Sequence, residues 1–418
     1  MQTDRKHPAE EVSSSVSDGG RELTCRAIYQ VASSARFRPG EQIVLRDFPT
    51  RFGRADVIAW SRWDDVGLEA PIPREMLFAI EGSAPSIQEA IGEFAGIAQF
   101  VSTLVAFATN VHGGRVAAHV AYDASPDKQE REFRQFARSA ERGLVREGRL
   151  VNKALALNLL TPQIVEHPDW KRIGRAIGHY ELALRDWVIG GEALCLMHLF
   201  IAAEALSKAA VRARCGALGL TEKELAEKSG IATDDPARPR WKDLLRAEMR
   251  REVLFCGDSA VHDAARDASD GLEHGFMDFS EIHDRARDVT LQTFRYIRRA
   301  ILDLLEVPEP ARTELAGIEP RDVLSLNRIL HGVLTGPEPL AAPGQQYPQF
   351  EWTSEIPRVW WEGDDLKFTI RDRWHPLLGA DVTFNATAYE FHGRQEEGRP
   401  FDAATLEMTV EVDNTSLD

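Results

Sequence analysis

The stretch from Trp170 to Arg214 constrains the fold of this chain more than any other segment, because it is long, apolar and helical in its periodicity. In its first half, Ile177, Tyr180 and Leu184 recur at helical spacing and form one apolar stripe. Gly190-Gly191 is predicted to bend or split the helix. The second half is apolar nearly all round, which is typical of a central helix buried between others. The sequence therefore predicts a helical core in the middle of the chain.

The segments around this core also have helical periodicity, and together they predict a helical bundle over residues 126–335. The expected helices are a charged amphipathic segment at 128–148, a segment at 149–160, a short polar helix at 221–230, and helices at 241–254, 280–305 and 321–336. A loop is expected at 232–240, where Asp234-Asp235-Pro236 interrupts the pattern.

Residues 23–125 are predicted to form a small α+β domain. The pieces LTCRAIYQVA, EQIVLRDF, ADVIAW and VAAHVAYD favour strands. Ser86 and Glu89 have the spacing of a capping box at the start of a helix that runs to Thr109. That helix approaches membrane length, but its two glycines and Gln99, together with mostly small apolar side chains, indicate a buried core helix. We expect no membrane span.

The two ends of the chain differ from its middle. Residues 1–22 are polar and Ser-rich, lack an apolar signal segment, and are expected to be disordered. Residues 336–349 read as a Pro/Gly-rich linker. Residues 350–418 contain four alternating β-runs and are expected to form a small antiparallel domain. The predicted fold is therefore mainly α, a helical bundle flanked by a small α+β domain and a small antiparallel β domain.

Charge and cysteine content restrict the class of function. The net charge of −16 argues against general binding of polyanions, so any nucleic-acid site needs a local basic face. Residues 341–418 hold 15 acidic against 6 basic residues, which gives the β domain a large share of that imbalance. The four cysteines are far apart in sequence and form no CxxC pair, as expected of reduced thiols in a cytoplasmic protein.

Common cofactor and metal signatures are absent from the sequence. No GxGxxG follows a strand, and no GxxxxGK[ST], HExxH or GxSxG occurs. His198 lies six residues from both Glu192 and Glu204, a spacing that places the three side chains on different faces of a helix. We therefore expect no metal and no cofactor, and we expect Glu204 to pair with Lys208 or with a neighbouring helix.

A sharper candidate site is the segment RDASDGLEHGF, where Arg266, Asp270, Glu273 and His274 crowd together. Asp270-Gly271 favours a turn, and an imidazole held beside charges at the edge of a helical core is suited to acid–base chemistry near neutral pH. The alternative is that His274 caps a helix or packs. We take Arg266 and His274 as the candidate catalytic residues.

A basic run follows this segment. Arg295, Arg298 and Arg299 are spaced so that they share a helix face, and such a face suits the binding of a phosphodiester substrate. We take these three arginines as candidate substrate-binding residues. The alternative is a solvated helix end with arginines near its C-terminal turn.

The apolar helix HLFIAAEALSKAAVR, followed by a segment ending in EHGF and then by another helix, resembles the HEPN superfamily, in particular its Apea-like and methylamine-utilisation protein J-like members. The resemblance covers about residues 170–305. It implies a helical bundle, a dimer, and metal-independent ribonuclease activity in a bacterial stress or defence system. His274 matches the family's histidine. Arg266 is one residue farther from it than the family's usual arginine, and Asp267 follows where the family often has Asn.

Two functions remain open at this point. In the first, the protein is an HEPN-like ribonuclease or RNA-binding protein, in which the Arg266 guanidinium stabilises phosphate charge and His274 transfers protons. In the second, it is a non-catalytic scaffold or sensor that binds a protein partner through its C-terminal β domain. In both, we expect a homo-oligomer. A small-molecule enzyme with a site between the N-terminal domain and the bundle is a third possibility, for which the sequence names no substrate.

Overall fold

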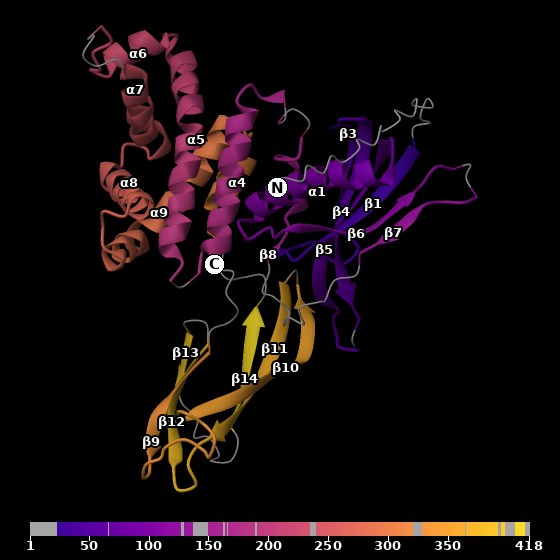
Figure 1. The fold of residues 1–418 in the computed structure, drawn as a ribbon, viewed down its shortest axis with the longest axis vertical. Helices are drawn as coiled ribbons and strands as arrows, with labels where there is room; N and C mark the ends of the chain where they lie inside the picture. Colours follow the sequence, from indigo (N-terminus) through magenta and orange to yellow (C-terminus); the bar gives the residue numbers. More distant parts are fainter. Residues whose placement is uncertain are drawn as a thin grey trace, which may run out of the picture.

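The computed structural model describes residues 23–413 apart from 66, 127–128, 137–148, 162–163, 165, 189, 235–239, 321–327, 364, 392–393 and 398–405. It has three parts: an antiparallel sheet with one long helix across it, a layer of helices beside that helix, and two small sheets below (Figure 1). The tail predicted at 1–22 lies outside the described residues.

The N-terminal sheet has six strands in the order β3-β4-β5-β1-β6-β7, all antiparallel. Their bounds are β1 Leu23–Val31, β3 Gln42–Thr50, β4 Gly53–Asp64, β5 Ile72–Ala84, β6 Val116–Asp123 and β7 Phe133–Gln135. A two-residue parallel pair joins β2 (Ala35–Arg36) to β8 (Arg149–Leu150). Alternate residues of β1 are buried, which is the pattern of a sheet with one covered face.

Helix α1 (Ile87–Thr109) covers that face of the sheet. The Ser86 side chain accepts a hydrogen bond from the Glu89 backbone N–H, so the predicted N-terminus is confirmed. The helix ends at Asn110, whose left-handed conformation (φ 53°) stops the backbone from continuing. The sheet, α1 and the helices beyond it share one continuous hydrophobic core.

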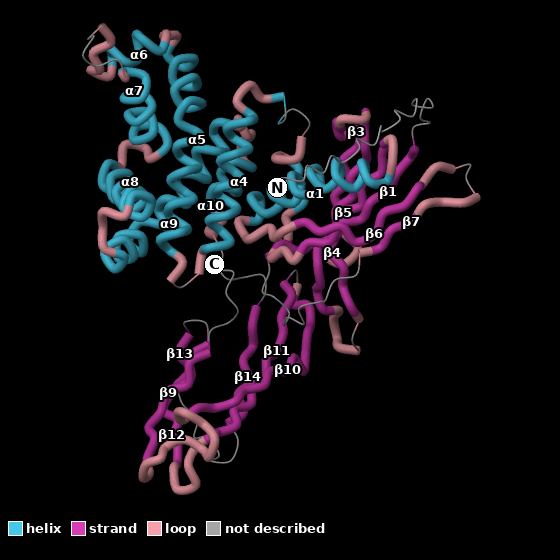
Figure 2. Tube along the Cα trace, viewed as in Figure 1, coloured by secondary structure: helices cyan, strands magenta, loops and turns pink. Residues whose placement is uncertain are grey.

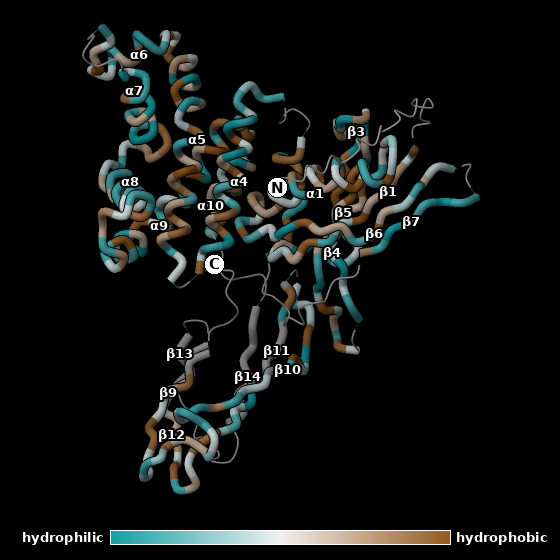
Figure 3. The backbone as a smooth tube through the Cα atoms, viewed as in Figure 1, coloured by the Kyte–Doolittle hydropathy of each residue, from teal (hydrophilic) through white to brown (hydrophobic). Residues whose placement is uncertain are grey.

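The helical part stands beside α1, with α4 between α1 and α5 (Figures 1 and 2). Its helices are α2 Lys153–Leu157, α4 Trp170–Asp186, α5 Glu192–Leu218, α6 Glu222–Lys228, α7 Trp241–Met249, α8 Ser259–His274, α9 Phe279–Leu304 and α10 Ala311–Gly317, and a π-helical turn at Arg250–Leu254 follows α7. Helix α5 packs against α4, α8 and α9 and has twelve buried residues, so the predicted central helix is confirmed. Figure 3 shows hydrophobic segments along α1, α4 and α5.

The predicted fold class is wrong as a whole, because 44% of the residues are helical and 28% are in strands, and a large antiparallel sheet forms the N-terminal part. Strand β5 pairs with both β4 and β1 in the sheet, but it has no counterpart among the predicted strands. Phe133–Gln135, predicted as part of a charged helix, instead extends the sheet edge as β7. Pairing with β6 overrides the local helical pattern there. The rest of that predicted helix lies largely outside the described residues.

Two three-stranded sheets form the C-terminal part. One has the order β10-β11-β14 and the other β13-β12-β9. The strands are β9 Arg328–Thr335, β10 Gln349–Glu362, β11 Asp365–Leu377, β12 Thr383–Phe391, β13 Arg394–Glu397 and β14 Leu406–Asp413. The predicted helix at 321–336 is therefore wrong from Arg328 onward, because pairing with β12 makes this segment a strand.

The C-terminal part contacts the sheet through the β4–β5 hairpin. Trp63, at the end of β4, packs on Trp361 with ring centroids 6.0 Å apart. Arg358 makes a bidentate ion pair with Glu69 in the hairpin, at 2.8 and 3.0 Å. Around these contacts lies a second small core that includes Ala70 and Ile72 of the hairpin region. The hairpin thus joins the two β parts of the molecule.

Helices α1 and α5 are long and apolar enough to cross a bilayer, among the helices that the structure describes. More than half of the most apolar window of each is buried inside the protein, 56% in α1 and 61% in α5. Burial of this kind is typical of the core helix of a folded protein. The length and apolar composition of these two helices are therefore only weak evidence for a membrane span.

Candidate functional site

The two predicted catalytic residues lie on one helix, and the structure does not bring them together. Arg266 and His274 are eight residues apart on α8, which separates them by about 12 Å along the axis and about 80° around it. The Arg266 guanidinium donates to Asp267 at 2.8 Å and lies 3.4 Å from Asp263. His274 is the last residue of the helix and is exposed. Arg266 is therefore occupied by carboxylates of its own helix.

The turn expected at Asp270-Gly271 is instead the interior of α8. Packing explains the glycine here: a Cβ on Gly271 would lie 3.0 Å from the Met277 side chain. Glycine therefore leaves room for the segment that follows the helix. The helix ends four residues later, at Gly275, whose left-handed conformation (φ 66°) suits a glycine.

The three arginines predicted to share a basic face of α9 do not form one exposed surface. Arg298 is 1% exposed, and its guanidinium donates to the backbone carbonyls of Leu315 at 2.5 Å, Ala108 at 3.1 Å and Phe107. Arg295 points to solvent but pairs with Glu319 at 2.8 Å, and Arg299 is exposed. Arg298 is therefore not presented at the surface as the prediction requires, because the helix turns this residue into the core.

Arg266 does line a cavity of about 350 Å³ between α6, α7 and α8, together with His262 and Arg251. Burial lowers the pKa of His262, whose ring packs edge-on against Phe255. The cationic groups here are already neutralised: Arg251 pairs with Glu248 at 2.7 Å, as Arg266 does with its aspartates. An anionic ligand would have to displace these pairs.

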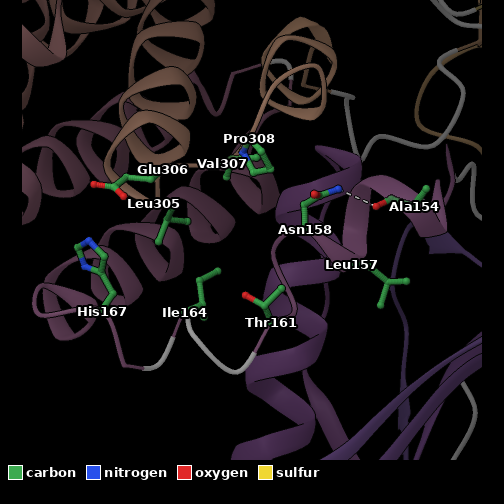
Figure 4. A pocket seen from close by; sticks show the side chains of 10 residues that line it. All are labelled: Ala154, Leu157, Asn158, Thr161, Ile164, His167, Leu305, Glu306, Val307 and Pro308. Carbon is green, nitrogen blue, oxygen red and sulfur yellow. Dashed lines mark hydrogen bonds between the residues drawn. The ribbon is translucent and has the colours of Figure 1, made fainter.

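A second cavity, of about 440 Å³, lies between α2 and the end of α9 (Figure 4). Glu306 is the one carboxylate among its lining residues, and His167 already accepts a hydrogen bond at Nδ1 from the Asp169 backbone N–H. The Asn158 side chain donates to the Ala154 carbonyl at 2.8 Å, within its own helix. These polar groups are turned to local partners and do not converge on a ligand position.

The groove between α1 and α4 has a different character. Its volume is about 370 Å³. Its floor contains Phe100 of α1 and Trp170 of α4, whose rings meet edge to face with centroids 5.2 Å apart. Lys171 and Arg175 lie on its α4 side, are exposed, and form no ion pair with any residue that the structure describes. The other lining residues are Gly96, Gln99, Thr103, Leu104, Gly174, Ile177 and Gly178.

Glycines keep this groove open. A Cβ on Gly96 of α1 or on Gly178 of α4 would meet no atom within 4 Å. Steric crowding therefore does not require glycine at either position. Glycine inside a helix nevertheless lowers the stability by about 0.5–1 kcal/mol relative to alanine. Gly174 is different, because its Cβ would lie 3.3 Å from the Trp170 ring. These glycines together leave the aromatic floor accessible.

A pair of histidines lies next to the groove, on the side of α4 that faces α5. His179 follows the lining residue Gly178, and its Nδ1 is 3.4 Å from Nδ1 of His198 on α5. The His198 Nε2 lies 3.4 Å from the Asp186 carboxylate. Asp186 is itself held by Arg185, which donates two hydrogen bonds at 3.0 Å.

The pKa of each of the two histidines lies below its ordinary value. Burial lowers the pKa of His179, and the nearby Arg175 charge lowers it further. Burial also lowers the pKa of His198, which the Asp186 carboxylate partly offsets. The described residues contain no group of three or more His, Cys, Asp or Glu that could hold a metal ion.

Sequence reasoning missed both the groove and the histidine pair. Lys171, Arg175 and His179 recur every four residues, which does place them on one helix face. The apolar stripe of the same helix dominates its pattern and hides this spacing. A scan of protein-family models and searches of curated proteins and of solved structures find no significant match to this chain.

Proposed function

We propose that this protein binds single-stranded RNA in the groove between α1 and α4. The observation that carries the proposal is that Lys171 and Arg175 stand beside an aromatic floor and form no ion pair with any described residue, in a chain whose net charge is −16. Two cations without a carboxylate partner in the described part of the chain are suited to neutralising phosphates, whereas Arg251 and Arg266 in the α6–α8 cavity already pair with carboxylates.

The groove matches one nucleotide unit in size and chemistry. Its volume of about 370 Å³ lies within the range of small-ligand sites. An unstacked base could lie against Trp170 or Phe100, while its phosphates lie along the α4 side near Lys171 and Arg175. Stacking requires an unpaired base, and for this reason we propose a single strand and not a duplex.

The resemblance to the HEPN superfamily remains a prediction, and its expected catalytic pair does not carry this proposal, since Arg266 and His274 lie apart on α8. We place the protein in the cytoplasm, which agrees with four cysteines that lie far apart in sequence and form no CxxC pair. A role in a bacterial stress or defence system, and a homo-oligomeric state, are retained as parts of the proposal.

The experiment is fluorescence anisotropy of the full-length protein with a labelled mixed-sequence oligoribonucleotide, measured at several salt concentrations. The double variant Lys171→Ala/Arg175→Ala is expected to weaken binding at least tenfold. It should also reduce the slope of log K against log salt by about 0.7 for each lost phosphate contact. Trp170→Ala is expected to weaken binding by about 1–3 kcal/mol with the slope unchanged.

Arg287→Ala is the matched control, because it removes an exposed positive charge from α9, outside the groove. It should leave both affinity and slope unchanged. If the double variant and Arg287→Ala bind RNA as the wild type does, or if the wild type does not bind, the proposal is wrong.

A second candidate function is protein binding by the C-terminal part. Tyr347 is 61% exposed and Trp352 is 43% exposed on this part of the molecule, and aromatic side chains are enriched in protein interfaces. A pull-down that recovers one stoichiometric protein, and loses it in a Tyr347→Ser/Trp352→Ser variant, would favour this function.

A further inference from the structure

We propose that His179 of α4 and His198 of α5 bind a zinc ion through their facing Nδ1 atoms, with Asp186 as a positioning residue. The observation behind it is a pair of half-buried imidazoles that meet across two neighbouring helices. The inference is independent of the proposed RNA binding, because neither histidine lines the groove between α1 and α4.

The geometry of the pair fits two ligands of one metal ion. The ring centroids lie 5.6 Å apart and the two Nδ1 atoms 3.4 Å apart, so the nitrogens lie on the facing edges of the rings. This separation exceeds the distance of about 2.7–3.2 Å that is usual for a hydrogen bond. Nitrogen ligands about 2.0–2.1 Å from a tetrahedral zinc ion lie about 3.4 Å from each other. An ion between the two rings thus needs little movement of either helix.

Asp186 makes the His198 Nδ1 available as a ligand. Its carboxylate lies 3.4 Å from the His198 Nε2, which favours the tautomer that carries the proton on Nε2 and leaves a lone pair on Nδ1. Arg185 holds this carboxylate in place with two hydrogen bonds at 3.0 Å. Histidines that bind metals commonly donate their second N–H to a carboxylate, which fixes the ring and makes the other nitrogen more basic.

The charges around the pair neither attract nor repel a cation strongly. Asp186 and Glu181 bring two negative charges, whereas Arg175 and Arg185 bring two positive ones. Glu181 is also turned to His112, in the turn after α1, at 2.8 Å. The affinity therefore has to come from the two nitrogen ligands.

The nature of the ligands selects the class of metal. Imidazole nitrogen suits zinc and other late first-row transition ions, whereas magnesium and calcium prefer oxygen. Cys195 lies one turn before His198 but is fully buried, and burial raises the pKa of its thiol, so it stays protonated. No third ligand joins the two histidines among the residues that the structure describes. Two coordination positions of the ion are thus open to water or to an added ligand.

The site lies between two helices and not along one of them. On α5 alone, Glu192 and Glu204 do not share a face with His198, and for this reason the sequence indicated no metal. The second ligand comes from α4, nineteen residues before His198. Glu192 is instead turned to His283 of α9, at 3.8 Å, which gives that region one imidazole and no facing pair.

The test is isothermal titration of the full-length protein with zinc chloride, after dialysis against EDTA and then against metal-free buffer containing excess magnesium. The wild type is expected to bind one zinc ion per chain with micromolar affinity. His179→Gln and His198→Gln are each expected to weaken binding by about a hundredfold or more, the upper end of what an outer-shell change alone costs. The double variant should bind no more weakly than either single one, because both ligands belong to the same ion.

His283→Gln is the matched control, since it removes a half-buried histidine from the same region without touching the pair. It should bind zinc as the wild type does. Zinc is also expected to raise the melting temperature of the wild type and of His283→Gln in proportion to the logarithm of its concentration, because it binds the folded pair. The melting temperatures of the two ligand variants should not respond to zinc.

Asp186→Asn tests the positioning role. It is expected to weaken zinc binding by about tenfold, with the stoichiometry unchanged and the melting temperature in EDTA equal to that of the wild type. A merely structural role would lower the melting temperature in EDTA and leave the zinc affinity as it is. Asp186→Glu, which restores the carboxylate, should recover part of the lost affinity.

The inference is overturned if the wild type binds no zinc, if both ligand variants bind it as tightly as the wild type, or if His283→Gln removes the binding. Circular dichroism of each variant in EDTA separates a lost site from a lost fold, and His179→Asn and His198→Asn replace a glutamine variant that does not fold. The anisotropy assay with RNA is read separately. Its result does not bear on the zinc site, because Lys171 and Arg175 are not ligands of the ion.

Discussion

The guanidinium of Arg298 on α9 donates a hydrogen bond to the backbone carbonyl of Phe107 in the last turn of α1, and it lies 4.8 Å from the centroid of the Phe107 ring. Its other donors reach the carbonyls of Ala108 and Leu315. The last carbonyls of a helix have no partner within the helix, and they carry the negative end of its dipole. A fully buried arginine thus joins the sheet-covering helix to the helical part of the molecule.

Replacing Arg298 with Met is expected to lower the free energy of unfolding by about 2–4 kcal/mol, because buried carbonyls would lose their donors. Arg299→Met is the control, since this neighbouring side chain is exposed and should change stability by less than about 0.5 kcal/mol. Urea unfolding of both variants checks this. Equal stabilities would show that Arg298 does not support the junction.

Gly178→Ala is expected to stabilise the protein by about 0.5–1 kcal/mol, because the added Cβ meets no atom and alanine is the better helix former. Gly178→Leu is expected to fill the groove and to weaken RNA binding at least tenfold while the protein stays folded. Thermal melting and the anisotropy assay measure the two effects. Gly216→Leu on α5 is the control for a bulky side chain at a glycine with open space outside the groove.

The stability of the protein is expected to fall as the pH drops below about 6.5. Burial lowers the pKa values of His179, His198 and His262 below the ordinary value of 6.5. In this range the unfolded chain binds more protons than the folded one, so unfolding is favoured by acid. Urea midpoints at pH 5 and pH 7 should differ in the wild type, and the difference should shrink in His262→Gln. A midpoint that is lower at pH 7 than at pH 5 would contradict the assigned directions.

Trp361→Ala is expected to loosen the C-terminal part from the β4–β5 hairpin, because the indole packs on Trp63 within the second hydrophobic core. Limited proteolysis should then release a C-terminal fragment faster than in the wild type. Arg358→Ala should have the smaller effect, since the ion pair that lowers the pKa of Glu69 is exposed to solvent. The opposite order of the two variants would mean that the ion pair, and not the core, holds this contact.

Much of the secondary structure could be predicted from local pattern. The alternation in LTCRAIYQVA became β1, and Ser86 with Glu89 marked the start of α1 as expected. Errors arose where pairing with a distant strand outweighed local propensity, as at Phe133–Gln135 and at Arg328–Thr335. A helical period of charged residues cannot reveal that a sheet edge lies beside it.

The candidate site could be predicted less well. Arg266 and His274 are close in sequence, which suggested a common site, but a continuous α8 separates them. The α9 arginines share a face only on a helix considered in isolation, and packing against α1 and α10 turned Arg298 inward.

The sequence by itself determined the central apolar helix, the capped helix that covers the sheet, and the local order of most strands, because side-chain periodicity and capping act over a few residues. Only the tertiary structure decided that α1 and α4 lie side by side with glycines between them, and that His179 meets His198 across two helices. Such contacts depend on how helices pack, and packing distances between residues far apart in sequence leave no local signal.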